Sequence, residues 1–312
     1  MAEILGPFAC LDSDELFDVE KFTGDFSIKI RACSDECVQF EMKGIAPPLA
    51  NAFRRILISE VPTVAISQVT MEQNTGVIPD EYLAHRLGLV PIVIDPDLLE
   101  WRLMDTDEFN ESNSIDFNLQ KSCDHNATSV SVYSGDLKWK PRNAEQAEKF
   151  KDNPPRPVCD DILIAKLCPG QEIDLSCRCE KGLGKDHAKW SPVCTAYYRL
   201  VPVIELTQDV VGDDAVRLRD ACPQGVIKLV KGRDGKKKAE VADPAKFNVH
   251  RECLQPFAEL GVKVTTSRDH YFFSIETVGA IPATTLFEKA VVVLKDKCIA
   301  ARRALVKRSS AI

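Results

Sequence analysis

The sequence predicts an α+β fold in which β-strands dominate and two amphipathic helices lie near the two ends of the chain. Runs of alternating apolar and polar residues recur with few helices between them, which is typical of antiparallel sheets rather than a doubly wound parallel sheet. The tract from 100 to 160 is polar and broken by proline and asparagine. We therefore expect a discontinuous antiparallel-sheet domain with two helices, interrupted by an inserted, mostly-β domain.

Composition narrows the class of protein. The chain has 312 residues, enough for about two domains. Its net charge of −7 argues against general nucleic-acid binding, although a local basic patch is compatible with it. The N-terminus is acidic, and no apolar run approaches the roughly 18 residues of a membrane span. Its twelve cysteines are scattered through a long chain, so we expect a soluble intracellular protein with reduced thiols in its core.

The first predicted elements are a hairpin and a helix. Two alternating runs, 26–32 and 38–42, flank the polar turn CSDEC, which predicts a β-hairpin with one buried face. Pro47 and Pro48 suit the first turn of a helix, and Pro62 ends that helix near Glu60.

The remaining elements follow from the same two periodicities. We expect a helix within PDEYLAHRLGLVP and, starting at Pro282, a long second helix. Asp234-Gly235 predicts the turn of a basic-tipped hairpin, 228–241. Strands are expected in the following stretches: Thr63 to Met71, ATSVSVYS, EIDLSCRCEKG, TAYYRLVPVIEL and HYFFSIETVG.

The first amphipathic helix contains the adjacent arginines of NAFRRILISEVPTVAI. At 100° per residue, one apolar arc suits contact with a sheet, and it comprises Leu49, Ala52, Phe53, Ile56 and Leu57. Ile58 lies on the other side, in line with Ala50 and Arg54, which indicates that a second surface approaches the helix. Arg54 and Arg55 are then interface residues, because the guanidinium fork suits interfaces. Two arginines extended over a solvated face remain the alternative.

The last helix carries a heptad-like seam with steps of 4, 3, 4, 3 and 4, formed by Phe287, Val291, Leu294, Cys298, Ala301 and Leu305. This spacing packs one helix along another, although an amphipathic helix on its own sheet also fits. Its basic residues gather toward the C-terminal half, where they complement the helix dipole, and they are Lys295, Lys297, Arg302, Arg303, Lys307 and Arg308.

Two other motifs suggest chemistry. KGLGKDH is no phosphate loop, because Cys179 and Asp186 stand where that motif needs glycine and serine or threonine, so we expect a glycine-rich turn. The middle cysteines 159, 168, 177, 179 and 194 include no CxxC pair. Cys177 and Cys179 continue a period-2 face and are expected to be core thiols, with a zinc or iron–sulfur module as the alternative.

Two further hypotheses concern single side chains. Cys194 and His187 could form a nucleophilic pair if the fold brings them together, which is the enzyme hypothesis. His85 is expected to be packed or solvated rather than a ligand. The tip of the basic hairpin has no interleaved aromatic residues, so a solvated tip is favoured over a nucleic-acid contact.

Several long motifs carry a family resemblance. NAFRRILISEVPTVAI, DEYLAHRLGLVPI and DHAKWSPV together resemble the α-subunit family of cellular RNA polymerases. The stretches 191–206 and 268–298 are similar, more narrowly, to the larger α-like subunit shared by nuclear RNA polymerases I and III. The polymerase II counterpart typically has a zinc knuckle that is absent here. The resemblance covers nearly the whole chain from about residue 20, but it is weak over 100–160.

The resemblance implies a layout and a role. The layout is a dimerisation domain at 17–66 and 195–312, an insert domain at 67–194 and a flexible tail at 1–16. The role is a non-catalytic assembly subunit that pairs with a smaller α-like subunit. That pair is the platform for the second-largest subunit, with small zinc-binding subunits alongside. The implied contact with the second-largest subunit involves Asn51, Arg54 and Arg55. The implied heterodimer residues are Phe53, Ile56, Leu57, Ile58, Phe287, Val291, Leu294, Cys298, Ala301 and Leu305.

The resemblance also implies that nucleotide addition belongs to the two largest subunits. We therefore expect no catalytic, cofactor or metal residue in this chain, contact with DNA only through the complex, and no membrane contact. The expected location is the nucleus, including the nucleolus, and the expected products of the complex are ribosomal RNA precursors and small RNAs such as 5S rRNA and tRNA. The sequence leaves open whether the chain serves both polymerases.

Overall fold

A computed structural model describes residues 18–102, 108–231, 236–247 and 251–309. The chain forms two compact units. One contains the described parts of 1–29, 41–47 and 200–272, and the other contains those of 30–40, 48–199 and 273–312. The tail expected at 1–16 and the turn at Asp234-Gly235 lie outside the described residues.

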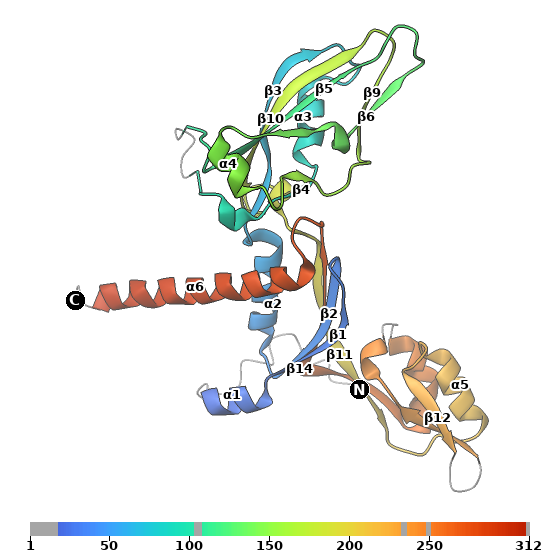
Figure 1. Cartoon of the computed structure of the whole chain (residues 1–312). Helices are drawn as coiled ribbons and strands as arrows, with labels where there is room; N and C mark the ends of the chain where they lie inside the picture. The colour runs from blue at the N-terminus through green and yellow to red at the C-terminus, as the bar shows by residue number, and fades with distance from the viewer. Residues whose placement is uncertain (1–17, 103–107, 232–235, 248–250, 310–312) are drawn as a thin grey trace. The chain divides into compact units, whose positions relative to one another are not determined.

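Mixed helices and antiparallel sheets confirm the α+β class (Figure 1). One four-stranded sheet has the order β1-β2-β14-β11. Its strands are β1 (Ser27–Cys33), β2 (Cys37–Lys43), β14 (Val262–Thr277) and β11 (Val193–Leu206). The hairpin turn is closed between Ser34 and Cys37, where the Ser34 amide donates to the Cys37 carbonyl over 2.9 Å.

The prediction of one buried face for the first hairpin holds for β2 only. Val38, Phe40 and Met42 are buried, whereas every residue of β1 is exposed. Ile30 is 64% exposed. The strand β1 lies at one edge of its sheet, and its alternating pattern marks an apolar row that the described part of this chain leaves uncovered.

A second four-stranded sheet has the order β3-β10-β5-β7. Its strands are β3 (Thr63–Asn74), β10 (Glu172–Gly182), β5 (Ser114–Ser122) and β7 (Lys138–Lys140). Two two-stranded sheets accompany it, β4 (Ile92–Val93) with β8 (Arg156–Pro157), and β6 (Val130–Tyr133) with β9 (Leu163–Leu167). The helices of this region are α3 (Asp80–Gly88) and α4 (Ala144–Lys149), with short 3-10 turns at 96–98, 134–136 and 188–190.

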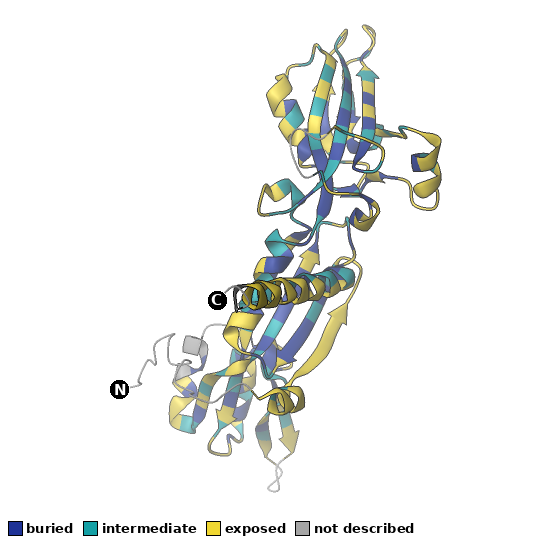
Figure 2. Cartoon of the chain, turned by 90° about the vertical axis from the view of Figure 1, so that its left-hand side faces the viewer, coloured by how far each residue is buried: buried dark blue, intermediate teal, exposed yellow. Residues whose placement is uncertain are grey.

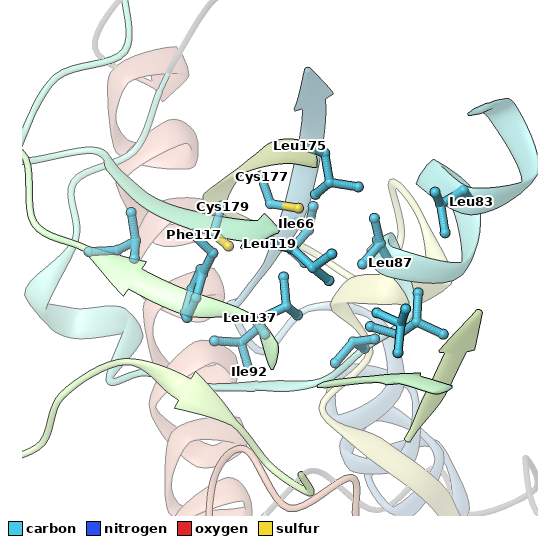
Figure 3. Close-up of a cluster of buried hydrophobic side chains, with 14 of the residues drawn as sticks. Ile66, Leu83, Leu87, Ile92, Phe117, Leu119, Leu137, Leu175, Cys177 and Cys179 are labelled. Carbon is cyan, nitrogen blue, oxygen red and sulfur yellow. The ribbon is translucent and has the colours of Figure 1, made fainter. Parts of the chain in front are cut away.

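The core of this region confirms the prediction of buried thiols. Figure 3 shows Cys177 and Cys179 of β10 among Phe117, Leu119 and Leu175. Burial raises the pKa of the Cys177 thiol to about 12 and raises that of Cys179 well above its usual value. These thiols are therefore neutral groups packed in the core near pH 7.

A smaller core surrounds α5 (Asp213–Ala221), β12 (Ile227–Lys231) and β13 (Lys237–Val241). Strands β12 and β13 pair antiparallel, which confirms the basic hairpin at 228–241. The helix α5 has no counterpart among the predicted elements. It begins after Gly212, whose φ of 71° suits glycine. Short 3-10 segments lie at 244–246 and 251–260, and α1 (Val19–Asp25) precedes β1.

The two predicted amphipathic helices are α2 (Pro47–Ser59) and α6 (Ala283–Ser309). Ile56 and Leu57 of α2 are buried as expected, but Leu49 is 37% exposed and Ala50, which was assigned to the opposite flank, is fully buried. No helix among the described residues is long and apolar enough to cross a membrane.

Candidate subunit interface

Aromatic side chains connect α2 and α6 to the sheet. The Phe287 ring of α6 lies 5.5 Å from the Phe53 ring of α2 and 4.8 Å from the Phe40 ring of β2. Phe40 in turn stacks on Phe273 of β14, and Phe273 contacts Tyr198 of β11. These contacts fix the N-terminal part of α6, so Phe287 serves the chain's own packing.

The C-terminal end of α2 is covered by the turn that contains Gly184. A Cβ atom at Gly184 would lie 2.3 Å from the carbonyl oxygen of Ile58, which explains why glycine is needed there. The Lys185 amide donates to the Ser59 carbonyl over 2.9 Å. This turn therefore packs against the backbone at the end of α2, and Ile58 itself is half-buried.

The segment after this turn is anchored to β3 and β10. The Trp190 ring lies over Gly182, where a Cβ atom would approach within 2.3 Å of it. Lys189 Nζ lies 4.3 Å from the centre of the Trp190 ring and donates to the Ile66 carbonyl over 3.0 Å. Burial lowers the pKa of Lys189. The motif DHAKWSPV thus has a packing role beside any contact with other chains.

The paired arginines of α2 differ in their surroundings. Arg54 is half-buried, and its Nε and Nη2 donate to Asn51 Oδ1 over 3.1 and 2.9 Å. Arg55 is exposed, and its guanidinium has no hydrogen bond or ion pair with any described residue. Asn51 therefore positions Arg54, whereas Arg55 offers all of its donors to the surroundings.

The seam residues of α6 change from packed to exposed along the helix. Phe287 and Leu294 are half-buried, while Val291, Cys298, Ala301 and Leu305 are exposed. Every residue from Lys295 to Lys307 is exposed, as the yellow length of α6 in Figure 2 shows. Lys297 pairs with Glu60 over 2.8 Å, which ties α6 to the residue after α2.

The exposed part of α6 has a second apolar row that the predicted seam omits. Val292, Ile299 and Val306 repeat every seven residues and directly follow Val291, Cys298 and Leu305. The five aliphatic members of these three pairs are between 37% and 70% exposed. Because seven residues are close to two helical turns, the pairs share one side of α6 and form an apolar band, here called the outer band.

Cys194 and His187, the residues of the enzyme hypothesis, are both exposed. Cys194 Sγ donates to the Thr277 carbonyl over 3.4 Å, and His187 Nδ1 accepts from the Lys189 amide over 3.1 Å. His85 is exposed, with its ring 6.5 Å from that of His187. Within the described ranges, no three histidine, cysteine or acidic side chains lie together in a way that could hold a metal.

A long helix that exposes a band of aliphatic side chains is typical of α+β proteins that assemble with another chain. The family model of the RNA polymerase Rpb3/Rpb11 dimerisation domain matches residues 39–298. The chain belongs to this family.

Similar proteins come from distant organisms. DNA-directed RNA polymerases I and III subunit RPAC1 of Homo sapiens is 42% identical over 299 residues, which cover 91% of this chain and 86% of the human protein. The Saccharomyces cerevisiae protein of the same name is 41% identical over 304 residues, which cover 92% of this chain and 89% of the yeast protein. DNA-directed RNA polymerase subunit Rpo3 of Methanothermobacter thermautotrophicus is 32% identical over 275 residues, which cover 86% of this chain and 95% of the archaeal protein.

Proposed function

We propose that this chain is a non-catalytic assembly subunit of DNA-directed RNA polymerases I and III. The names of the human and yeast relatives support both polymerases, and their similarity extends over most of each chain. On this proposal the two largest subunits carry out nucleotide addition, and the complex makes ribosomal RNA precursors, 5S rRNA and tRNA. The protein acts in the nucleus, including the nucleolus.

The proposed mechanism is heterodimerisation with the small α-like subunit. The single observation that carries it is the exposed C-terminal half of α6, whose aliphatic side chains a folded monomer would be expected to cover. A dimerisation domain at 17–66 and 195–312 supplies α2 and α6, and an insert domain at 67–194 interrupts it. Covering the exposed seam and the outer band with a partner removes apolar surface from water and stabilises the pair.

The heterodimer then forms a platform for the second-largest subunit, with small zinc-binding subunits alongside. We assign the contact with the second-largest subunit to Asn51, Arg54 and Arg55. Arg55 is the central residue because its guanidinium is exposed and has no partner among the described residues. A carboxylate or carbonyl of the docking subunit would accept its hydrogen bonds.

The test is reconstitution of assembly from purified subunits. The chain is co-expressed with the small α-like subunit, and binding of the second-largest subunit to the purified pair is measured. Arg55→Glu should weaken this second step more than tenfold, because it places a carboxylate where a cation is needed, and should leave the pair intact. The matched control is Lys149→Glu, which reverses an exposed charge on α4. Equal binding by wild-type and Arg55→Glu pairs would refute the role of Arg55.

A further inference from the structure

The exposed half of α6 has a charge pattern that its own fold does not use. From Cys298 to Ser309 the sequence contains four basic residues and no acidic residue, in a chain whose net charge is −7. Lys295, Arg302 and Arg303 are exposed and make no ion pair or hydrogen bond through their side chains with any described residue. Lys297, by contrast, is paired with Glu60.

The helix dipole accounts for only part of this pattern. A cation interacts favourably with the dipole within the last turn of a helix. Arg302 and Arg303 lie seven and six residues before Ser309, the last residue of α6, which is about two turns away. Their charges therefore need another stabilising partner, or they remain solvated.

The positions of these charges connect them to the outer band. Lys295 is three residues after Val292, and Arg302 is three residues after Ile299, so both lie between successive apolar pairs on the same side of the helix. Arg303 is three residues before Val306 and lies beside the band. A surface that covers the outer band must also face these cations.

A second copy of this chain is a poor occupant of such a surface. In a two-fold symmetric pair the same patch is used by both copies, so each copy brings the same three cations to the interface. Like charges facing each other at an interface are destabilising and act as a means of specificity.

We propose that the outer band binds an acidic partner surface. In the heterodimer, an apolar surface of the small α-like subunit covers the outer band, and carboxylates at the border of that surface face Lys295, Arg302 and Arg303. This inference rests on the proposed heterodimer and adds the chemistry of its other half. The band supplies the apolar contact, and the three cations decide which α-like surface pairs with it and oppose pairing of the chain with itself.

The experiment measures dissociation of the purified heterodimer. Fluorescently labelled small α-like subunit in the complex is chased with an excess of the unlabelled subunit, at about 50 mM and about 300 mM salt, where the Debye length differs more than twofold. The wild-type pair should dissociate several-fold faster at the higher salt. R302E/R303E should dissociate about tenfold faster than wild type at low salt, a change of about 1.4 kcal/mol, and should lose or invert the salt dependence.

The control keeps the change in net charge the same. K149E/K166E reverses two exposed charges on α4 and β9 and should dissociate like the wild type. If the wild-type pair forms but neither salt nor R302E/R303E changes its dissociation, the acidic-partner inference is wrong and the heterodimer proposal stands. If R302E/R303E leaves heterodimer dissociation unchanged and makes the chain associate with itself, a second copy is the occupant and the inference is wrong. If no wild-type pair forms, the proposed function itself fails.

Discussion

Replacing Leu305 by alanine should separate the stability of the chain from its assembly. Leu305 is 70% exposed on α6, so its side chain contributes little to the chain's own core. Full burial of a leucine side chain is worth about 1.5–3 kcal/mol, so roughly 1–2 kcal/mol remains for a partner that covers it. Alanine is also the best helix former, so α6 should stay intact.

The expected result is a heterodimer whose dissociation constant rises about five- to thirtyfold. The thermal unfolding of the chain's own domains, followed by circular dichroism, should change little, since exposed substitutions usually cost less than about 0.5 kcal/mol. Leu163→Ala is the matched control, because Leu163 is an exposed leucine on β9. If Leu305→Ala binds the small α-like subunit as tightly as Leu163→Ala does, the outer band is not part of the interface.

Three further predictions concern the chain's own packing. Gly184→Ala should lower the unfolding free energy of the heterodimer by about 1–3 kcal/mol, because the added Cβ meets the Ile58 carbonyl. The control Gly24→Ala adds a Cβ that meets nothing within 4 Å and should not lower it. Equal melting temperatures for the two variants would contradict the close approach of the turn to α2. Cys177 should resist iodoacetamide in the native protein while Cys159 and Cys168 react, as peptide mass spectrometry can show; rapid native labelling of Cys177 would disprove its burial. Burial raises the Cys177 pKa from 9.0 to about 12, so its thiol should stabilise the fold fully below about pH 9 and lose that contribution as the pH rises from 9 toward 12. Urea unfolding at a series of pH values measures the unfolding free energy, with Cys177→Ser as the comparison.

The sequence predicts elements best where one face is buried by the chain itself. The stretch EIDLSCRCEKG coincides with β10, Glu172–Gly182, because its alternating residues meet the hydrophobic core on one side only. The helix starts at Pro47 and just after Pro282 were likewise predicted, since proline restricts where a helix can begin.

Periodicity in the sequence shows which side of an element is apolar, but it does not show whether another part of the chain covers that side. The alternating pattern of β1 is as regular as that of β2, yet every residue of β1 is exposed because no described part of the chain covers it. The helix α5 has only two buried residues, Ala215 and Leu218, and no side-chain cap, so its pattern was too weak to predict.

The candidate interface was predictable in part. The seam on α6 was traced as a narrow stripe, and the structure divides it into packed residues such as Phe287 and exposed ones such as Leu305. Val292, Ile299 and Val306 follow a seven-residue repeat outside that stripe, so the predicted seam does not include them. The sequence does not predict which arginine of the pair is held by Asn51. In the structure Arg54 bonds to Asn51, and Arg55 has no partner among the described side chains.

Hydrogen exchange of α6 tests most directly the central claim that a partner covers the exposed part of this helix, because the amide exchange rates can be compared with and without the partner. Amide exchange from Val291 to Lys307 is compared in the chain alone and in the complex with the small α-like subunit, with the helix α5 as the internal reference. The account predicts that exchange over this part of α6 slows by at least about tenfold on assembly while α5 is unchanged. Equal exchange of α6 in both states would contradict it.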